Sequence, residues 1–270
     1  MLPDFEMIVR RFPDRPNIKV YPIADVHLGA IECMEGPWGR FRRMIEEDPN
    51  AYLILAGDLI NNATRNSVGD GIFRSTMSPR EQKRAIVEHL KPLRNRILCM
   101  VGGNHERRTD RDTDSSPALD IASKLDLEDI YRDSMAFLKL QFGDKKGDGR
   151  KNPTYTFAVT HGAGSSIYTT ASPVRAERMG MAIDGVDALV VGHIHKPQSF
   201  PVGKYYVDTR NEKVTTQPFR VFVCTSWLEG APYGLQKMMS PAVFHLSHFE
   251  LRGDKKAIGA HDDEDFNSSV

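Results

Sequence analysis

The segment Ile97-Leu98-Cys99-Met100-Val101-Gly102-Gly103-Asn104-His105-Glu106 shows the pattern on which this chain is organised. Five apolar residues run into two glycines and then into side chains that can bind a metal or move a proton. A short apolar run of this kind is typical of a buried β-strand. The polar residues therefore follow the carboxyl end of a predicted strand, which is where an open α/β sheet gathers its ligands.

Four further apolar runs end in the same way. Residues 18–24 lead to Asp25-Val26-His27, residues 52–56 to Gly57-Asp58, residues 155–160 to His161-Gly162, and residues 188–191 to Gly192-His193-Ile194-His195. We expect the carboxyl ends of these strands to meet at one edge of one sheet. That edge would collect eight polar side chains, namely Asp25, His27, Asp58, Asn104, His105, His161, His193 and His195.

These side chains have the chemistry of a metal site. Imidazole nitrogens together with carboxylate or amide oxygens, without thiolate, suit Mn, Fe, Zn or Ni. Two metals also need an anionic ligand that can bridge them, and a carboxylate has two oxygens to do so. A metal pair about 3.5–4 Å apart is the arrangement used for in-line displacement at phosphorus. The sequence therefore predicts two divalent metal ions, of which Mn is favoured. A single histidine is more often structural, so the prediction depends on the five blocks together.

The blocks D-x-H, G-D, G-N-H-E, H-G and G-H-x-H, in this order, resemble the calcineurin-like metallophosphoesterase family. The resemblance extends from Asp25 to His195. It implies an α/β fold, a four-layer αββα sandwich of two mixed sheets flanked by helices. It also implies hydrolysis of a phosphoester by a hydroxide that bridges the two metals.

The resemblance further implies a role for each residue of the blocks. His105 would be the general acid that protonates the leaving oxygen, and it would not be a ligand. Asp58 would bridge the two metals. The first metal would be held by Asp25, His27 and His195, and the second by Asn104, His161 and His193.

The second block differs from that of the protein serine/threonine phosphatases of this superfamily, which reads G-D-x-x-D-R-G. Here Asn61 replaces the second Asp, which orients the catalytic His, and Asn62 replaces the Arg that grips phosphate. This favours a phosphodiesterase acting on a nucleotide or nucleic acid. A phosphomonoesterase or protein phosphatase remains the alternative. A non-catalytic interaction scaffold is a further one, but such scaffolds lose ligands or the catalytic His.

Arginines follow the third block in the polar segment 106–115, which we expect to be a loop at the rim of the site. Arg107 and Arg108 stand nearest to His105, and their guanidinium groups suit phosphate oxygens. They are therefore candidate substrate-binding residues. The alternative is that the arginines of this loop pair with its own aspartates.

Helix and strand signals fill the rest of the chain. Ser78-Pro79-Arg80-Glu81 predicts a capping box and a helix to about Leu90. Other helices are expected over residues 117–125, 173–181 and, with a weaker signal, 37–47. A hairpin is expected from residues 135–142 and 153–160, and late strands at 204–208, 219–225 and 243–251.

Composition bounds the class of protein. The 270 residues carry 36 basic and 36 acidic side chains, so no global charge indicates a nucleic-acid coat or membrane surface. Three cysteines argue against a disulfide framework, and no apolar stretch predicts a signal peptide or membrane span. We therefore expect a cytoplasmic protein with one domain over residues 1–252 and a mobile acidic tail over 253–270. Nothing in the sequence indicates an oligomeric state.

Overall fold

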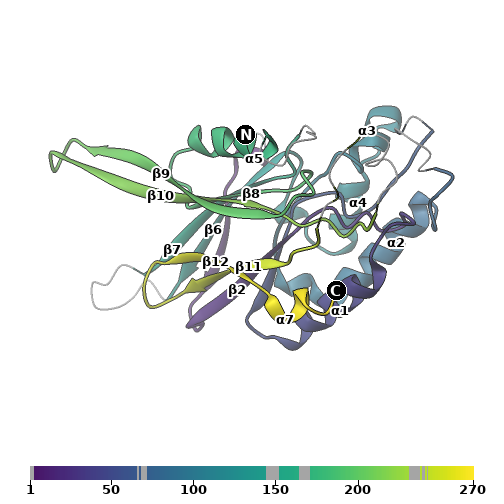
Figure 1. Cartoon of the computed structure of the whole chain (residues 1–270), viewed down its shortest axis with the longest axis horizontal. Coiled ribbons are helices and arrows are strands. Elements are labelled where there is room, and N and C mark those ends of the chain that lie inside the picture. The colour runs from purple at the N-terminus through teal and green to yellow at the C-terminus, as the bar shows by residue number, and fades with distance from the viewer. Residues whose placement is uncertain are drawn as a thin grey trace.

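Two six-stranded sheets pack face to face in the computed structural model, and helices cover their outer faces (Figure 1). The structure describes residues 3–65, 67, 72–143, 152–163, 171–230, 238, 241 and 243–270. The expected α/β architecture of two mixed sheets flanked by helices is confirmed.

The first sheet has the order β12-β11-β2-β3-β4-β5. Strands β2, β3, β4 and β5 are parallel to one another. Strand β11 runs antiparallel to its two neighbours, β2 and β12. The strands are β2 (Asn17–Ile23), β3 (Ala51–Leu55), β4 (Ile97–Val101), β5 (Tyr131–Arg132), β11 (Ser247–Arg252) and β12 (Ile258–Asp262).

The second sheet has the order β1-β6-β7-β8-β10-β9. Strands β7, β8 and β10 are parallel, whereas β6 pairs antiparallel with β7, and β9 pairs antiparallel with β10. The strands are β1 (Ile8–Phe12), β6 (Met135–Phe142), β7 (Thr154–Thr160), β8 (Ala188–Val191), β9 (Gln198–Asp208) and β10 (Lys213–Val223).

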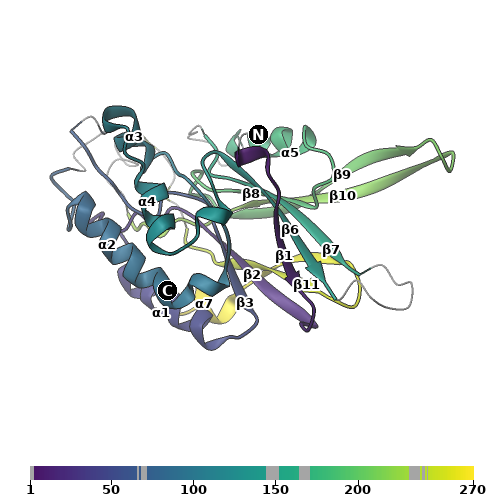
Figure 2. The ribbon, with the colours of Figure 1, turned by 180° about the vertical axis from the view of Figure 1, so that it is seen from behind.

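Helices α1 (Glu35–Glu47), α2 (Pro79–Leu90) and α4 (Pro117–Lys124) lie on the outer side of the first sheet, and α5 (Ala171–Met181) lies on the outer side of the second (Figures 1 and 2). Each of α1, α2 and α4 buries one apolar face in the core; on α1 this face is Trp38, Phe41 and Ile45. The short helices are η1 (Pro3–Phe5), η2 (Lys91–Arg96), α3 (Arg107–Thr113), η3 (Glu128–Ile130) and α7 (Glu264–Asn267).

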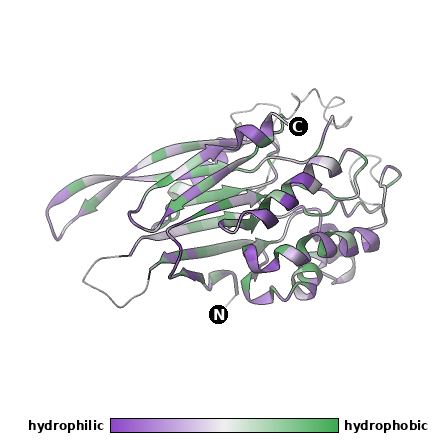
Figure 3. Cartoon of the chain, turned by 90° about the horizontal axis from the view of Figure 1, so that it is seen from below, coloured by the Kyte–Doolittle hydropathy of each residue, from purple (hydrophilic) through white to green (hydrophobic). Residues whose placement is uncertain are grey.

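Aromatic side chains fill the space between the sheets. Phe249 of β11 lies 5.2 Å from Phe157 of β7 and 4.8 Å from Phe222 of β10, measured between ring centroids. All three rings are almost fully buried. Figure 3 shows the hydrophobic residues concentrated on the strands, with hydrophilic residues on the exposed sides of the helices. This core fixes the two sheets relative to one another.

Two predicted helix starts, at Ser78 and Ser116, are confirmed, whereas α5 begins at Ala171 and not at residue 173. The Ser78 hydroxyl accepts a hydrogen bond from the Glu81 N–H, and the Glu81 carboxylate accepts one from the Ser78 N–H at 2.8 Å. The Ser116 hydroxyl likewise accepts from the N–H of Leu119 at the start of α4. The weaker helix signal at 37–47 corresponds to α1, and the predicted hairpin strands are β6 and β7.

Two expectations about the chain are wrong. Residues 253–270 do not form a mobile tail, because β12 extends the first sheet and α7 buries Phe266 against Phe41 and Trp227. The segment after His105 is not a loop but begins the helix α3. The tail was predicted to be mobile because residues 253–270 are mostly acidic and polar, and the few apolar residues among them, such as Phe266, were given too little weight. Most of the turn expected after Phe142 lies outside the described residues.

The late strands also differ in length from the prediction. Strands β9 and β10 are 11 residues each, whereas β11 starts at Ser247 rather than at residue 243. Strand β9 pairs with β10 over its full length, and this pairing lengthens both strands beyond the apolar runs that predicted them.

Candidate metal centre

The predicted ligands do not come from one sheet, as the sequence suggested. Asp25, Asp58 and Asn104 follow β2, β3 and β4 of the first sheet, whereas His161 and His193 follow β7 and β8 of the second. The carboxyl ends of both sets of strands point to the same end of the sandwich. The site is therefore built across the two sheets.

Backbone geometry singles out the same residues. A non-glycine residue with positive φ is strained by about 1–3 kcal/mol and persists where the surrounding structure enforces it. Five of the predicted ligands have φ between 49° and 63°: Asp25, His27, Asp58, His193 and His195. Each chain segment thus turns sharply as it leaves its strand, which aims the ligand side chain into the site.

One group of ligands consists of Asp25, His27 and His195. Nε2 of His195 lies 3.1 Å from Oδ1 of Asp25 and 3.3 Å from Nε2 of His27. Asp25 and His27 are buried, and one donor atom from each of the three residues lies within 4.8 Å of the others. These are the three residues expected to hold the first metal.

A second group consists of Asp58, His161 and His193, whose donor atoms also lie within 4.8 Å of one another. Nε2 of His161 lies 3.2 Å from Oδ2 of Asp58 and 2.9 Å from Oδ1 of Asn104. The other ring nitrogen of His161 contacts the backbone carbonyl of Ala56 at 2.8 Å. Such a contact fixes the ring and leaves Nε2 to face the group, as for histidines that bind metals.

Asp58 connects the two groups. Its Oδ2 is 3.2 Å from His161 in the second group and 3.9 Å from His27 in the first. Nitrogen and oxygen donors converge from both sides of a buried carboxylate, without thiolate. This donor set fits divalent metal ions, and Asp58 stands where a bridging ligand is needed.

The charges in this cluster are strongly coupled. Burial lowers the pKa of His161, but the adjacent Asp58 carboxylate outweighs burial and raises that pKa to about 9. Burial and the neighbouring His105 hold the pKa of His27 well below its usual range. Metal ligation needs neutral imidazoles, so a cation bound here would take the place of the proton that Asp58 favours on His161.

His105 lies beside the ligands but has other partners. Its Nδ1 donates to the backbone carbonyl of Asn61 at 2.7 Å, and its Nε2 accepts from Nη2 of Arg108 at 2.8 Å. Nε2 is also 3.7 Å from Oδ2 of Asp58. Burial and the nearby Arg108 guanidinium lower the pKa of His105 to about 4, despite Asp58. The imidazole is thus held with Nε2 directed at the centre.

The two candidate arginines differ in their environment. Arg107 donates to the backbone carbonyls of Asp133 and Gly102 and lies 3.9 Å from the Asp133 carboxylate. Arg108 instead lies over His105 and also donates to the carbonyl of Asn61 at 3.2 Å. Only Arg108 of this pair is placed against the candidate catalytic group.

The second block acts through the backbone as well as through side chains. Asn61 fixes the His105 ring through its backbone carbonyl and not through its side-chain amide. The Asn62 side chain is buried and donates to the carbonyl of His105 at 2.7 Å and to Thr109 Oγ1 at 2.8 Å. Asn62 therefore supports the start of α3 and is not available to grip phosphate.

Glu106 is a site residue to which the sequence assigned no role. Its carboxylate is buried and accepts from the backbone N–H groups of Asp58, Ile60 and Gly103, each at 3.1 Å. Burial and the Asp58 carboxylate raise the pKa of Glu106 to about 7. A Cβ on Gly103 would lie 2.1 Å from Oδ1 of Asp58. In the sequence, Glu106 is the last residue of the G-N-H-E block, and this position is the only local sign of its role. Its hydrogen bonds connect the third block to the backbone of the second.

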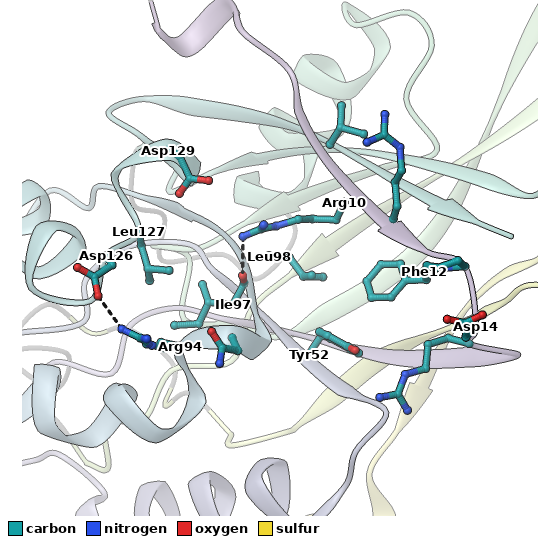
Figure 4. A pocket seen from close by; sticks show the side chains of 15 residues that line it. Arg10, Phe12, Asp14, Tyr52, Arg94, Ile97, Leu98, Asp126, Leu127 and Asp129 are labelled. Atoms are coloured by element: carbon teal, nitrogen blue, oxygen red, sulfur yellow. Dashed lines mark hydrogen bonds and ion pairs between the residues drawn. The ribbon is translucent and has the colours of Figure 1, made fainter. Parts of the chain in front are cut away.

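A cavity of about 600 Å³ lies elsewhere, at the amino ends of β3 and β4 (Figure 4). Phe12, Tyr52 and Leu98 form part of its wall. Arg94 on its rim pairs with Asp126 at 2.6 Å, and Arg10 donates to the carbonyl of Ile97 at 3.5 Å. It contains none of the predicted ligands, which follow the opposite ends of these strands.

The fold and the convergent histidine and aspartate groups define a metal-dependent phosphoesterase. The sequence profile of the calcineurin-like phosphoesterase family matches residues 18–197. The chain belongs to this family. A search of curated proteins found no match. Among the described residues, no helix is both long and apolar enough to cross a membrane.

Proposed function

We propose that this protein is a phosphodiesterase that hydrolyses a nucleotide or nucleic-acid substrate with two divalent metal ions. Asp25, His27 and His195 would hold one ion; Asn104, His161 and His193 would hold the other, with Asp58 between them. Ions bound there would supply an activated water and positive charge for the non-bridging phosphoryl oxygens. We favour Mn²⁺ because the donors are nitrogen and oxygen, with Fe, Zn and Ni as alternatives.

His105 would take up a proton from solvent at Nε2 when the substrate draws Arg108 away, and would pass that proton to the leaving oxygen. The Asn61 carbonyl fixes its Nδ1–H, so Nε2 is the atom that faces the centre. An alkoxide is a poor leaving group, and a positioned acid is worth about 10²–10⁴ in rate. Arg108 lies within 2.8 Å of that nitrogen and would transfer its hydrogen bond to a phosphate oxygen when substrate enters.

The observation that carries the diesterase proposal is the burial of the Asn62 side chain. Asn62 is 1% exposed, and its amide is fully engaged with the backbone of residues 105 and 106. The position that grips phosphate in the protein phosphatases is here part of the scaffold. Because Asn62 cannot contact the substrate, the site has fewer groups to bind the additional negative charge of a phosphomonoester. A phosphomonoesterase would need that charge met by other groups at the rim.

A substrate panel tests this proposal. The metal-stripped protein is reconstituted with Mn²⁺ and assayed with bis- and mono-p-nitrophenyl phosphate, cyclic nucleotides, single-stranded DNA and phosphoserine peptides. We expect turnover of the diesters and little or none of the phosphopeptides. Higher kcat/KM for phosphopeptides would replace the diesterase with the monoesterase alternative.

The cysteines of the chain bear on its location in the cell. Cys33, Cys99 and Cys224 are all free thiols. Unpaired cysteines are typical of a reducing compartment, and on this basis we propose that the enzyme acts in the cytoplasm.

A further inference from the structure

Strands β9 and β10 continue beyond the sandwich as a two-stranded ribbon (Figure 1). Strand β10 pairs with β8 only from Arg220 to Val223, while it pairs with β9 from Lys213 to Val223. Residues 202–208 of β9 and 213–219 of β10 therefore pair only with each other, and we call them the arm. An isolated two-stranded ribbon is at best marginally stable in water.

The two faces of the arm differ in chemistry. Alternation along the strands places three charged residues, Lys204, Asp208 and Lys213, on the outer face. The inner face carries no charge and consists of Gly203, Tyr205, Val207, Val214, Thr216 and Pro218.

The inner face is exposed to solvent. Tyr205 is 85% exposed, Val207 63% and Val214 64%. Val207 stands directly opposite Val214, and Tyr205 opposite Thr216, so the three apolar side chains form one patch. In Figure 3 the ribbon carries hydrophobic stretches between hydrophilic ones. A contiguous apolar patch on a protruding element is typical of an interaction site.

The inner face of the arm continues the interior of the sandwich. Phe222 lies on the same side of β10 as Val214 and Thr216, and its ring packs at 4.8 Å on Phe249 of the first sheet. Toward the free end of the arm, no described residue of the first sheet covers this surface, as the exposure of Val207 and Val214 shows. Beyond the first sheet the arm is thus a single layer whose inner face is uncovered.

Arg220 at the base of the arm and Glu212 in the turn at its tip carry opposite charges. Arg220, at the base, donates to Ser199 Oγ and makes no ion pair among the described residues. Its pKa is lowered by burial alone, with no carboxylate to oppose the shift. Glu212, at the tip, likewise makes no ion pair with a described residue, whereas Asp208 is engaged by the N–H groups of residues 210 and 211. The other tip charges are Arg210 and Lys213, the latter on the outer face.

We propose that the arm is a dimerisation element, in which the inner faces of two arms from two copies of this chain pack on each other about a two-fold axis. An antiparallel arrangement places the tip of one arm over the base of its partner. In the register that brings Glu212 to Arg220 of the partner subunit, Val207 lies over Gly203 of the partner subunit, where no side chain stands in its way. The uncharged centre of the face lets two identical surfaces meet without repulsion.

Sedimentation velocity of the full-length protein over a micromolar concentration range tests the dimer. Val214→Glu places a charge on the inner face, and Thr215→Glu, its neighbour on the outer face, is the matched control. We expect the dissociation constant of the dimer to rise about tenfold or more for Val214→Glu and to change less than about twofold for Thr215→Glu. Thermal melting confirms that both variants are folded.

A charge exchange tests the antiparallel register. Arg220→Glu and Glu212→Arg should each weaken the dimer, and the double variant should recover affinity lost by the singles. A monomeric wild type throughout the range, or equal effects of Val214→Glu and Thr215→Glu, would overturn the dimer. A double variant that is no better than the sum of the singles would overturn the antiparallel face-to-face arrangement.

Discussion

The Asp58 carboxylate lies 3.2 Å from Nε2 of His161, although Asp58 follows a strand of the first sheet and His161 a strand of the second. The contact joins the two halves of the sandwich at the candidate metal centre. Because Asp58 is 1% exposed, its charge must be matched inside the protein. In the absence of metals His161 provides the matching charge, since its pKa is raised to about 9.

Removal of the charge of Asp58 should affect both metals. We expect Asp58→Asn to lower the affinity for both ions, because its carboxylate contacts both His27 and His161. His27→Ala should lower mainly the affinity for the first, because His27 lies with Asp25 and His195 and not with His161 and His193. Metal content after reconstitution with Mn²⁺, measured by mass spectrometry, checks this. At most one ion per chain in reconstituted wild type would contradict a dinuclear centre.

His105→Ala should separate chemistry from metal binding. The variant should retain its metals, and its hydrolysis of a diester with an alkoxide leaving group should fall by about 10²–10⁴. The loss should be smaller with a p-nitrophenolate leaving group, because that group departs without protonation. Steady-state rates on both substrates measure the difference, and equal losses would remove His105 from the role of the acid.

Arg107 and Arg108 are adjacent in sequence and form a matched pair for substitution by alanine. Arg108→Ala should raise KM for a nucleotide diester more than for a small aryl diester, since Arg108 faces the centre. Arg107→Ala should leave both KM values nearly unchanged, because its guanidinium is bound to the carbonyl of Asp133. The reverse order of effects would show that the two arginines exchange positions when substrate binds.

Glu106→Gln tests whether the buried carboxylate positions Asp58. A Gln side chain cannot accept all three backbone hydrogen bonds equally well, so the Asp58 backbone should lose its fixed position. We expect metal affinity to fall by about 10–100-fold, as for other groups that orient ligands. Titration with Mn²⁺ measures the change, and the exposed Glu88→Gln is the control. Unaltered affinity would limit Glu106 to a role in folding.

Docking of the C-terminal segment should depend on Tyr21. Its hydroxyl donates to Asp263 at 3.1 Å, and burial together with that carboxylate raises the pKa of Tyr21 above its usual value. A raised pKa gives stability that is present below about pH 10 and is lost as the pH rises further. Tyr21→Phe should lower the free energy of unfolding by about 1 kcal/mol near neutral pH.

The same variant should show a smaller deficit, or none, at about pH 11, because Phe cannot ionise. Urea unfolding at neutral and alkaline pH measures both values. A deficit that stays constant with pH would mean that Tyr21 titrates alike in the folded and unfolded chain.

Local features of the sequence predicted the strands that precede the candidate ligands and the capping box of α2, and the structure contains both. They could do so because an apolar run and a capping box act over a few neighbouring residues. The assignment of all ligand strands to one sheet was wrong. Strand pairing is a long-range choice, and β7 joins β6 and β8 in a different sheet from β2, β3 and β4.

Other parts of the site depend on contacts between segments far apart in sequence. The Asn61 carbonyl fixes His105, and Glu106 binds the backbone at Asp58, because the second and third blocks meet only in the folded chain. In the sequence Asn62 occupies the position of the phosphate-binding Arg of the protein phosphatases. In the structure its side chain is buried against α3 and has a structural role. The C-terminal segment is ordered because Phe266 reaches a pocket formed by Phe41 and Trp227. The sequence by itself thus determined which side chains could bind metal. The tertiary structure decided which backbone groups hold those side chains in place, because burial and hydrogen bonds between distant segments leave no local pattern in the sequence.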